Sequence, residues 1–495
     1  MPDVQKRSHE GDENRMININ LSGMTSAANL PDSEREILRD LIGIYEFHFW
    51  KNEQKDKYYE GHVTLADVNL GIALPDGFKG LEVGCEWGAK CVDVLAARSM
   101  FDGFVDMNGG ELPGLTRIVE SNNLISEYAK ACCDELKYGC TFATLSADEE
   151  DGCKIRFHTP RTAAARWSGV DGRIDCGFAI IDTEPDESEL AYSPKLVNFH
   201  TSTDIWVLSC KDSEWIAERY AHKMGRPLME PLVWNPTSAK PFGRSRLKAS
   251  IRHLIEGYVR TIANATIGLE FSTTPQKYLL GITDKQYDAV ISDKFKQYVG
   301  SILAGTTNPE TGEKPSVGQF QQGTLTPHVE MMRLLATQFS AATGLSVTDT
   351  GVVNNANPTS ADAVIAQTNT LISMAEKLNA SNGNSLKVIA LMAQAIARNV
   401  TLDELGDSER DIVAHFRNPA MPSVSSMTDA ALKIATARQG FAGTDVFLEM
   451  IGFDQADIRR IRAQEQRISG SQILLDEFSE VEQEEDDADI TGGVE

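Results

Sequence analysis

Two long amphipathic stretches in the second half of the chain constrain its fold more than any other feature. In the first, apolar residues recur three and four positions apart without a proline, namely Leu247, Ile251, Leu254, Ile255, Tyr258 and Ile262. This spacing predicts one helix of about 24 residues within 241–268, about 36 Å long at 1.5 Å per residue. The second stretch predicts a helix over 326–345. It opens with an N-cap hydroxyl and a proline, Thr326–Pro327, and stops at Gly344.

The two helices bracket a compact insertion over residues 269–325. The insertion contains a strand-like run at Lys277–Ile282, a short helical window at Thr283–Val299 and a turn at Asn308–Gly312. After the second helix, residues 346–358 hold Gly351 and several asparagines without helical periodicity, which predicts a flexible loop. A third helix should follow over 359–379, capped by Thr359 and Asp362.

The first half of the chain alternates short strand-like and helical patterns, which predicts an α+β layer over residues 32–240. A helix should begin near Asp32, and short β-like runs at 154–158, 177–181 and 204–209 alternate with helical windows at 91–99 and 121–135. Residues 1–31 are expected to be a flexible N-terminus. The fold class predicted for the whole chain is therefore α+β.

The C-terminal part is expected to be mostly helical over 380–471 and to end in a disordered acidic tail over 472–495. No lysine or arginine follows Arg467, and residues 476–495 contain ten acidic residues. Such a run repels itself and lacks apolar anchors.

Composition limits the classes of function. Forty-seven basic against 72 acidic residues give a formal net charge of −25, which opposes tight wrapping of nucleic acid. No apolar stretch is long enough to cross a bilayer, and the first residues are polar. We therefore expect that the protein does not associate with a membrane and that it is assembled in a cytoplasm. The eight cysteines, all between Cys85 and Cys210, lack a Cys-x-x-Cys spacing, so we expect reduced, mostly buried thiols and no metal site.

Catalytic motifs are mostly missing. Leu81–Gly88 is similar to the glycine-rich turn of S-adenosylmethionine-dependent methyltransferases, but Glu86 and Trp87 stand where small residues are needed. Gly300–Gly305, followed by Thr306, lacks the lysine of a phosphate-binding loop. No zinc-protease or serine-hydrolase motif occurs. We therefore expect no enzyme activity and no cofactor.

A basic stripe accompanies the first long helix. Arg244, Lys248 and Arg252 are spaced four apart, so on a helix they would share one face. That face could meet DNA, or it could be a solvated, salt-bridged edge. The sequence leaves both interpretations open.

Three separated segments together resemble the portal proteins of long-tailed double-stranded-DNA bacteriophages. The first comprises Lys57–Gly61 with Trp87–Arg98 and Phe101–Phe104, the second is Phe242–Leu247, and the third is Asn357–Ala363 continuing to Leu371–Lys377. Their order and spacing over about 32–399 match the layout of that family.

This resemblance implies a structural subunit of a dodecameric ring around a DNA channel in the virion. It implies a wing over 32–240, stem helices over 241–268 and 326–345, a small α/β clip over 269–325, a tunnel loop over 346–358, a wing or tunnel helix over 359–379 and a crown over 380–471. It further implies that DNA passes the tunnel loop without sequence preference, at Val347, Thr348, Asp349, Val352, Val353, Asn354 and Asn355.

The implied partners are the terminase large subunit, a head-to-tail adaptor, and the major capsid and scaffold proteins. Genome packaging and ejection would pass through the ring. The alternatives are an unrelated cytoplasmic oligomeric scaffold or adaptor and, on the weaker glycine motif, a methyltransferase.

Overall fold

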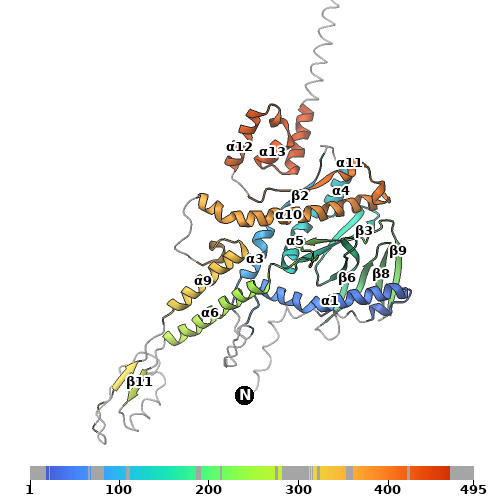
Figure 1. The fold of residues 1–495 in the computed structure, drawn as a ribbon. Coiled ribbons are helices and arrows are strands. Elements are labelled where there is room, and N and C mark those ends of the chain that lie inside the picture. Colours follow the sequence, from blue (N-terminus) through green and yellow to red (C-terminus); the bar gives the residue numbers. More distant parts are fainter. Residues whose placement is uncertain are drawn as a thin grey trace, which may run out of the picture.

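The computed structural model describes residues 18–19, 21, 23–64, 67, 83–107, 112–185, 191–211, 214–273, 277–280, 312, 314, 316–319, 324–352, 361–420 and 424–468. They form a mixed α+β body with a pair of helices extending from one side (Figure 1). The predicted fold class, α+β, is confirmed.

One half of the body is a long helix packed on a six-stranded sheet. Helix α1 (Asp32–Tyr59) buries Leu38, Leu41, Tyr45 and Phe49 at helical spacing against this sheet. The strand order is β5-β6-β7-β8-β9, with the short β1 beside β7. The bounds are β1 Asn18–Ile19, β5 Ala163–Ser168, β6 Arg173–Pro185, β7 Ala191–His200, β8 Asp204–Lys211 and β9 Glu214–Ala221.

The segment before α1 is part of this core, contrary to the expected flexible N-terminus over 1–31. A 3₁₀ turn, η1 (Met24–Ser26), precedes the helix, and Leu21, Met24, Ala27 and Leu30 are buried. Apolar residues recurring every third position can pack one side of such a turn onto the sheet. Residues 1–17 of this prediction lie outside the described residues.

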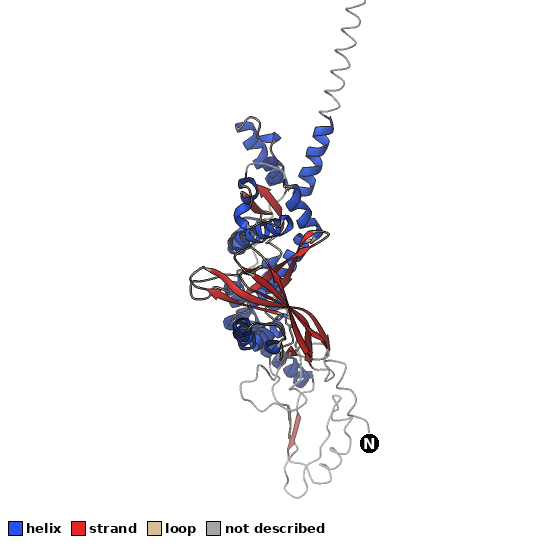
Figure 2. Ribbon diagram, turned by 90° about the vertical axis from the view of Figure 1, so that its right-hand side faces the viewer, coloured by secondary structure: helices blue, strands red, loops and turns tan. Residues whose placement is uncertain are grey.

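The other half of the body surrounds a three-stranded sheet of order β10-β3-β4. In the side view of Figure 2 the strands lie between the helix layers. The strands are β3 Cys140–Asp148, β4 Gly152–His158 and β10 Met229–Val233, and a separate pair joins β2 Phe101–Asp106 to β13 Ile412–Phe416. The helices of this half are α3 Trp87–Ala96, α4 Pro113–Ser121, α5 Leu124–Tyr138, α10 Ala361–Arg398 and α11 Asp407–Arg410.

Helix α10 runs without a break through the predicted boundary between residues 379 and 380. Leu371, Ala375 and Leu378 before that point, and Leu386 and Ile389 after it, are buried in the same core. The helix lies across β3, β4, β10 and β13. Residues 380–416 therefore pack with the body, and the helical region that stands apart from it begins later than predicted.

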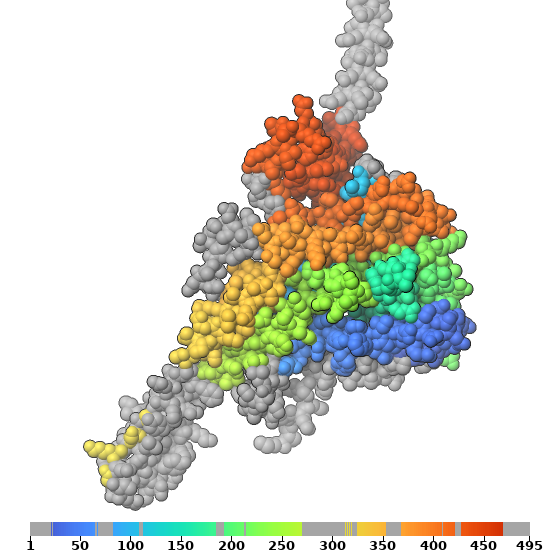
Figure 3. All heavy atoms as spheres, viewed as in Figure 1, coloured from blue at the N-terminus to red at the C-terminus, as the bar shows by residue number. Residues whose placement is uncertain are grey.

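The two predicted long helices are present and project side by side from the body, as Figure 3 shows in green and yellow. They are α6 (Ala249–Thr273) and α9 (Thr326–Thr343), which contact each other and carry a small ribbon, β11 Lys277–Leu280 with β12 Ser316–Gln319, beyond their far ends. Gly344 ends α9 with φ 77°, as predicted. Thr326 is the first helical residue rather than the N-cap, which is Leu325. The predicted helix over 283–299 lies outside the described residues.

Helix α6 starts eight residues later than the predicted range of 241–268, and it ends later as well. The amide of Arg244 donates to the Trp234 carbonyl at 3.1 Å and that of Arg246 to the Leu136 carbonyl at 2.9 Å. These amides are engaged by other elements and not by a preceding helical turn, so residues 244–246 form an extended connection.

A small helical group follows β13 and sits on the opposite side of the body from the ribbon (Figure 1). It consists of α12 Val424–Ala437, α13 Asp445–Ile451 and a helix over 455–468. The predicted acidic tail, 472–495, lies outside the described residues.

All eight cysteines are free and six of them are buried, which confirms their expected role as small apolar residues. No described helix is long and apolar enough to cross a membrane. Within the described residues, no group of three or more His, Cys, Asp or Glu side chains is placed to hold a metal ion.

Candidate functional site: the junction of the three motifs

Described residues from all three portal-like segments meet where α6 and α9 leave the body. We call this place the motif junction and define it by Tyr58, Trp87, Gly88, Gly243, Arg246 and Met374. These residues come from α1, α3, the connection before α6, and α10. Segments separated by hundreds of positions in the sequence thus share one structural location.

Gly88 allows α3 to cross directly over the end of α1. A Cβ atom at this position would lie 1.9 Å from the Tyr58 carbonyl oxygen and 3.2 Å from the Tyr59 Cα. Both are backbone atoms, which cannot move aside as a flexible side chain could. The glycine thus serves helix packing, and this explains it without a methyltransferase turn. Leu81 and Glu82 of that motif lie outside the described residues.

Trp87 joins the start of α3 to both projecting helices. Its ring stacks on Tyr258 of α6 with centroids 4.1 Å apart and lies 4.7 Å from the Phe339 ring of α9. Its Nε1 donates to the Thr350 carbonyl at 3.1 Å. One buried indole therefore fixes α6, α9 and the turn after α9 relative to the body.

Arg246 lies at the centre of the motif junction and is only 7% exposed. Its Nε donates to the Cys91 carbonyl at 2.6 Å, one terminal nitrogen donates to the Thr343 carbonyl at 2.8 Å, and the guanidinium lies over the Trp234 ring at 5.9 Å. Because Thr343 is the last residue of α9, its carbonyl carries the partial negative charge of a helix C-terminus. Arg246 thereby ties α3 to the end of α9.

Two glycines allow the close backbone contacts around Arg246. Gly243 has φ 65°, and a Cβ there would lie 2.2 Å from the Trp234 carbonyl oxygen. Gly344, with φ 77°, would place a Cβ 3.2 Å from the Thr370 side chain of α10. Both positions combine a left-handed backbone with a close neighbour, so other residues are unfavourable.

A buried polar network anchors α10 next to the motif junction. Asn382 donates through Nδ2 to Glu135 at 2.6 Å and to the Tyr128 hydroxyl at 3.0 Å, and Tyr128 contacts Ser99 at 2.7 Å. Glu135 is fully buried, and loss of solvation raises the pKa of its carboxyl to about 8. At neutral pH this carboxyl is therefore mostly protonated inside the body.

The predicted basic stripe does not form. Arg244 and Lys248 precede α6 and are exposed, so only Arg252 stands on the helix. Arg252 donates to Gln54 at 2.9 Å and lies over the Tyr58 ring at 5.5 Å, which joins it to α1. The late start of α6 removes the common helical face on which the stripe depended.

The first part of the predicted loop is an ordered turn. Residues Thr348–Thr350 form η2, Asp349 accepts bonds from the Ser346 amide and hydroxyl at 3.0 and 2.8 Å, and Val352 packs partly buried against the core. Val347 is half-buried, whereas Thr348 and Asp349 are exposed. Val353, Asn354 and Asn355 lie outside the described residues.

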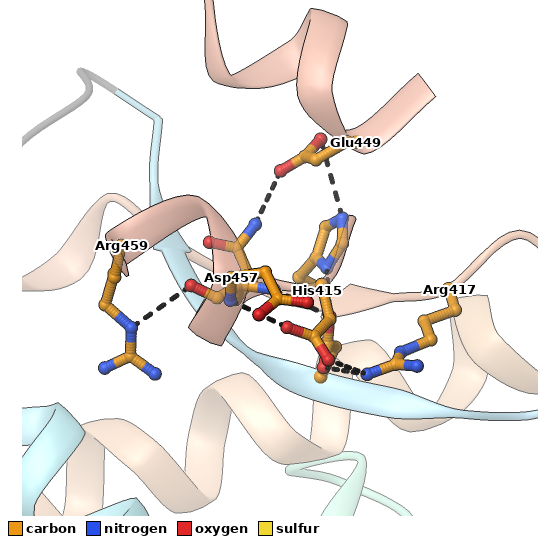
Figure 4. A network of polar contacts seen from close by, with 8 residues as sticks. His415, Arg417, Glu449, Asp457 and Arg459 are labelled. Atoms are coloured by element: carbon orange, nitrogen blue, oxygen red, sulfur yellow. Dashed lines mark hydrogen bonds and ion pairs between the residues drawn. The ribbon is translucent and has the colours of Figure 1, made fainter. Parts of the chain in front are cut away.

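A second polar network joins the C-terminal helical group to the body (Figure 4). Arg417 bridges Asp102 at 3.1 Å and Asp454 at 3.0 Å, and the Gln455 amide donates to Asp102 at 3.3 Å. His415 lies 3.7 Å from Glu449 of α13. These contacts attach the group chiefly through β2 and β13.

The sequence patterns did not single out Arg246, although it lies in the second portal-like segment, Phe242–Leu247. The four-residue spacing indicated Arg244, Lys248 and Arg252. The buried cation is Arg246, which lies between the exposed Arg244 and Lys248. Gly243, three residues before Arg246, and the adjacent Leu247 were the available signal, because glycine can mark a close backbone approach and leucine is commonly buried.

No protein-family model matches the chain, and no curated protein is similar to it in sequence. Among solved structures, the neck of a native gene transfer agent particle, computed with C12 symmetry, is similar over 75% of this chain and 90% of that one, with 11% identity and a TM-score of 0.44. The virion of the native particle gives 10% identity and a TM-score of 0.43 over 74% of this chain and 89% of that one.

An HK97-family phage portal protein from Corynebacterium diphtheriae is similar over 68% of this chain and 94% of that one, with 12% identity and a TM-score of 0.32. The matched structures thus include the family that the three sequence segments resemble.

Proposed function

We propose that this chain is a non-catalytic portal subunit, about twelve copies of which form a ring around a DNA channel at one vertex of the capsid of a tailed phage or related particle. The motif junction carries this proposal. The residues that resemble the portal family do not form a catalytic or cofactor site in the described structure. They fix a projecting helix pair to an α+β body, which is what a ring subunit with a stem requires.

The surface of the helix pair supports assembly into a ring. Leu269 of α6 is 46% exposed, and Val329, Met331 and Leu334 of α9 are 38%, 43% and 52% exposed. Met331 and Leu334 are three residues apart and therefore share one face of α9, where a partner would cover them. A neighbouring copy related by rotation would cover them, and repetition of such a head-to-tail contact closes a ring.

In this assembly residues 32–240 form the wing, α6 and α9 the stem, the residues between these two helices the clip, and the helical group from residue 424 onward most of the crown. The expected partners of this assembly are the terminase large subunit, a head-to-tail adaptor, and the major capsid and scaffold proteins. Genome packaging and ejection would use the channel.

Contact with DNA would be steric and weak. Residues 346–358 contain no lysine or arginine, and the chain carries a net charge of −25, so phosphates would not be held by charge. DNA would slide past Val347, Thr348, Asp349 and the residues that follow. Arg244 and Lys248, although exposed, are not aligned along a helix and are not proposed as a DNA track.

Complementation in a strain that produces the particle tests this function. We expect removal of the chain to yield heads without packaged DNA, and the wild-type chain supplied in trans to restore DNA-filled heads. A variant lacking residues 353–357 should still form rings but should package or retain less DNA. DNA-filled heads at normal yield without the chain would contradict the proposal and favour an unrelated oligomeric adaptor.

A further inference from the structure

A polar cavity of about 280 Å³ lies between the two sheets of the body. Its lining comes from β3 and β4 of one sheet and from β6 and β7 of the other. The residues that define it chemically are Thr144, Ser146, Lys154, Arg156, Asn198 and His200. The cavity is separate from the motif junction, and none of the sequence motifs includes it.

Two cations on β4 face this cavity. Arg156 pairs in register with Thr144 and Lys154 with Ser146, so all four residues lie on one face of the β3–β4 hairpin. Neither cation has a carboxylate partner among the described residues, although the chain as a whole is strongly acidic. The one carboxylate in the lining, Asp148, accepts a bond from the Asp151 amide at 2.9 Å.

His200 stands at the buried side of the cavity and has no exposed surface. Neither ring nitrogen has a hydrogen-bond partner in the described structure. Burial lowers the pKa of His200 to about 3, so the ring is neutral and still carries one N–H donor. An N–H donor left without an acceptor in such a place destabilises the folded chain. A ligand oxygen in the cavity would supply the acceptor.

We propose that the cavity binds the phosphate group of a small molecule, with Lys154 and Arg156 neutralising it and His200 donating to it from the buried side. Ser146 and Asn198 offer further neutral donors of the kind that hold phosphate oxygens. A pocket of this volume between two sheets admits a small ligand and not a DNA duplex. This inference does not depend on the proposed ring or on its channel.

Calorimetric titration of the full-length chain with inorganic phosphate, at constant ionic strength in chloride buffer, tests the site. We expect saturable binding by the wild-type chain and at least about tenfold weaker binding by a Lys154→Gln/Arg156→Gln double variant, because charge-assisted bonds supply much of the affinity. Lys211→Gln, on β8 and outside the cavity lining, should bind as the wild type does.

His200→Phe should also lose phosphate binding while keeping its fold, since a phenyl ring fills the same space and needs no polar partner. If that variant fails to fold, the surface pair Lys154 and Arg156 still decides the question. Absence of binding up to about 10 mM phosphate would overturn the proposal. Equal binding by the wild type and the double variant would overturn it as well, because phosphate would then be held elsewhere.

Discussion

Arg246 joins α3 to the end of α9 and contacts the Met374 sulfur of α10 at 3.5 Å, without a carboxylate partner in the described structure. Truncating it would leave the Thr343 carbonyl at the end of α9 without its donor and would remove the second donor to the Cys91 carbonyl. We predict that Arg246→Ala lowers the free energy of unfolding by about 2–4 kcal/mol. Arg244→Ala, two residues away on the surface, should change it by no more than about 0.5 kcal/mol. Chemical denaturation followed by circular dichroism measures both, and equal effects would contradict this role.

The contact between α1 and α3 depends on the absence of a side chain at Gly88. Because an added Cβ would lie 1.9 Å from a backbone oxygen, Gly88→Ala must push the helices apart. We predict a loss of about 3 kcal/mol or more. Gly84→Ala is the matched control, since nothing lies within 4 Å of a Cβ there. Thermal unfolding of the two variants should differ clearly, and a Gly88→Ala chain as stable as wild type would refute the packing explanation.

Glu135 makes stability depend on pH in a direction that burial dictates. Its pKa is about 8 in the folded chain against an ordinary value of 4.5, so unfolding releases a proton between these values. The contribution of Glu135 is therefore complete below about pH 4.5 and is lost as pH rises through 8. Glutamine cannot ionise, so we predict that Glu135→Gln matches wild type near pH 5.

At pH 9, above both pKa values, the same variant should be more stable than wild type by about 5 kcal/mol. Comparing the two chains at each pH removes the contribution of every other titrating group. A difference in unfolding free energy that stays constant from pH 5 to pH 9 would show that Glu135 does not carry the buried proton.

At the scale of elements, the projecting helix pair carries exposed apolar side chains that a neighbouring copy would cover in the proposed ring. We predict that Met331→Asp/Leu334→Asp abolishes oligomers and leaves a folded monomer, because charges on α9 would prevent apolar contact with a neighbour. Val170→Asp provides the control, since Val170 is 97% exposed at the turn between β5 and β6. Light scattering gives the mass of each variant. Oligomers of unchanged size in the double variant would exclude this surface from assembly.

Periodicity predicted the long helices because each carries one apolar face over several turns. Leu247, Ile251 and Ile255 are buried as the spacing required. It could not predict where α6 begins, since the amides of Arg244 and Arg246 are engaged by carbonyls far away in the sequence. The role of Arg246 could not be predicted for a similar reason. Arg246 is central because α3, α9 and α10 converge on it, and periodicity along the sequence does not report which elements converge in the tertiary fold.

For the whole molecule, the acidic balance and the exposed apolar side chains of the helix pair are both consistent with the proposed ring. A net charge of −25 would keep separate assemblies apart in solution, while the apolar surface of the helix pair would favour contact between neighbouring copies. Closed rings are therefore expected rather than aggregates of undefined size. The acidic residues of 476–495 should be dispensable for this, and a chain truncated after Gly470 should assemble as the full chain does.

Electron microscopy of the purified full-length chain, viewed end-on across a concentration series, tests the central claim most directly. The account predicts hollow rings of about twelve subunits with a channel wide enough for duplex DNA, roughly 20 Å or more. Monodisperse particles of 54.3 kDa at every concentration, or closed assemblies without a channel, would contradict it.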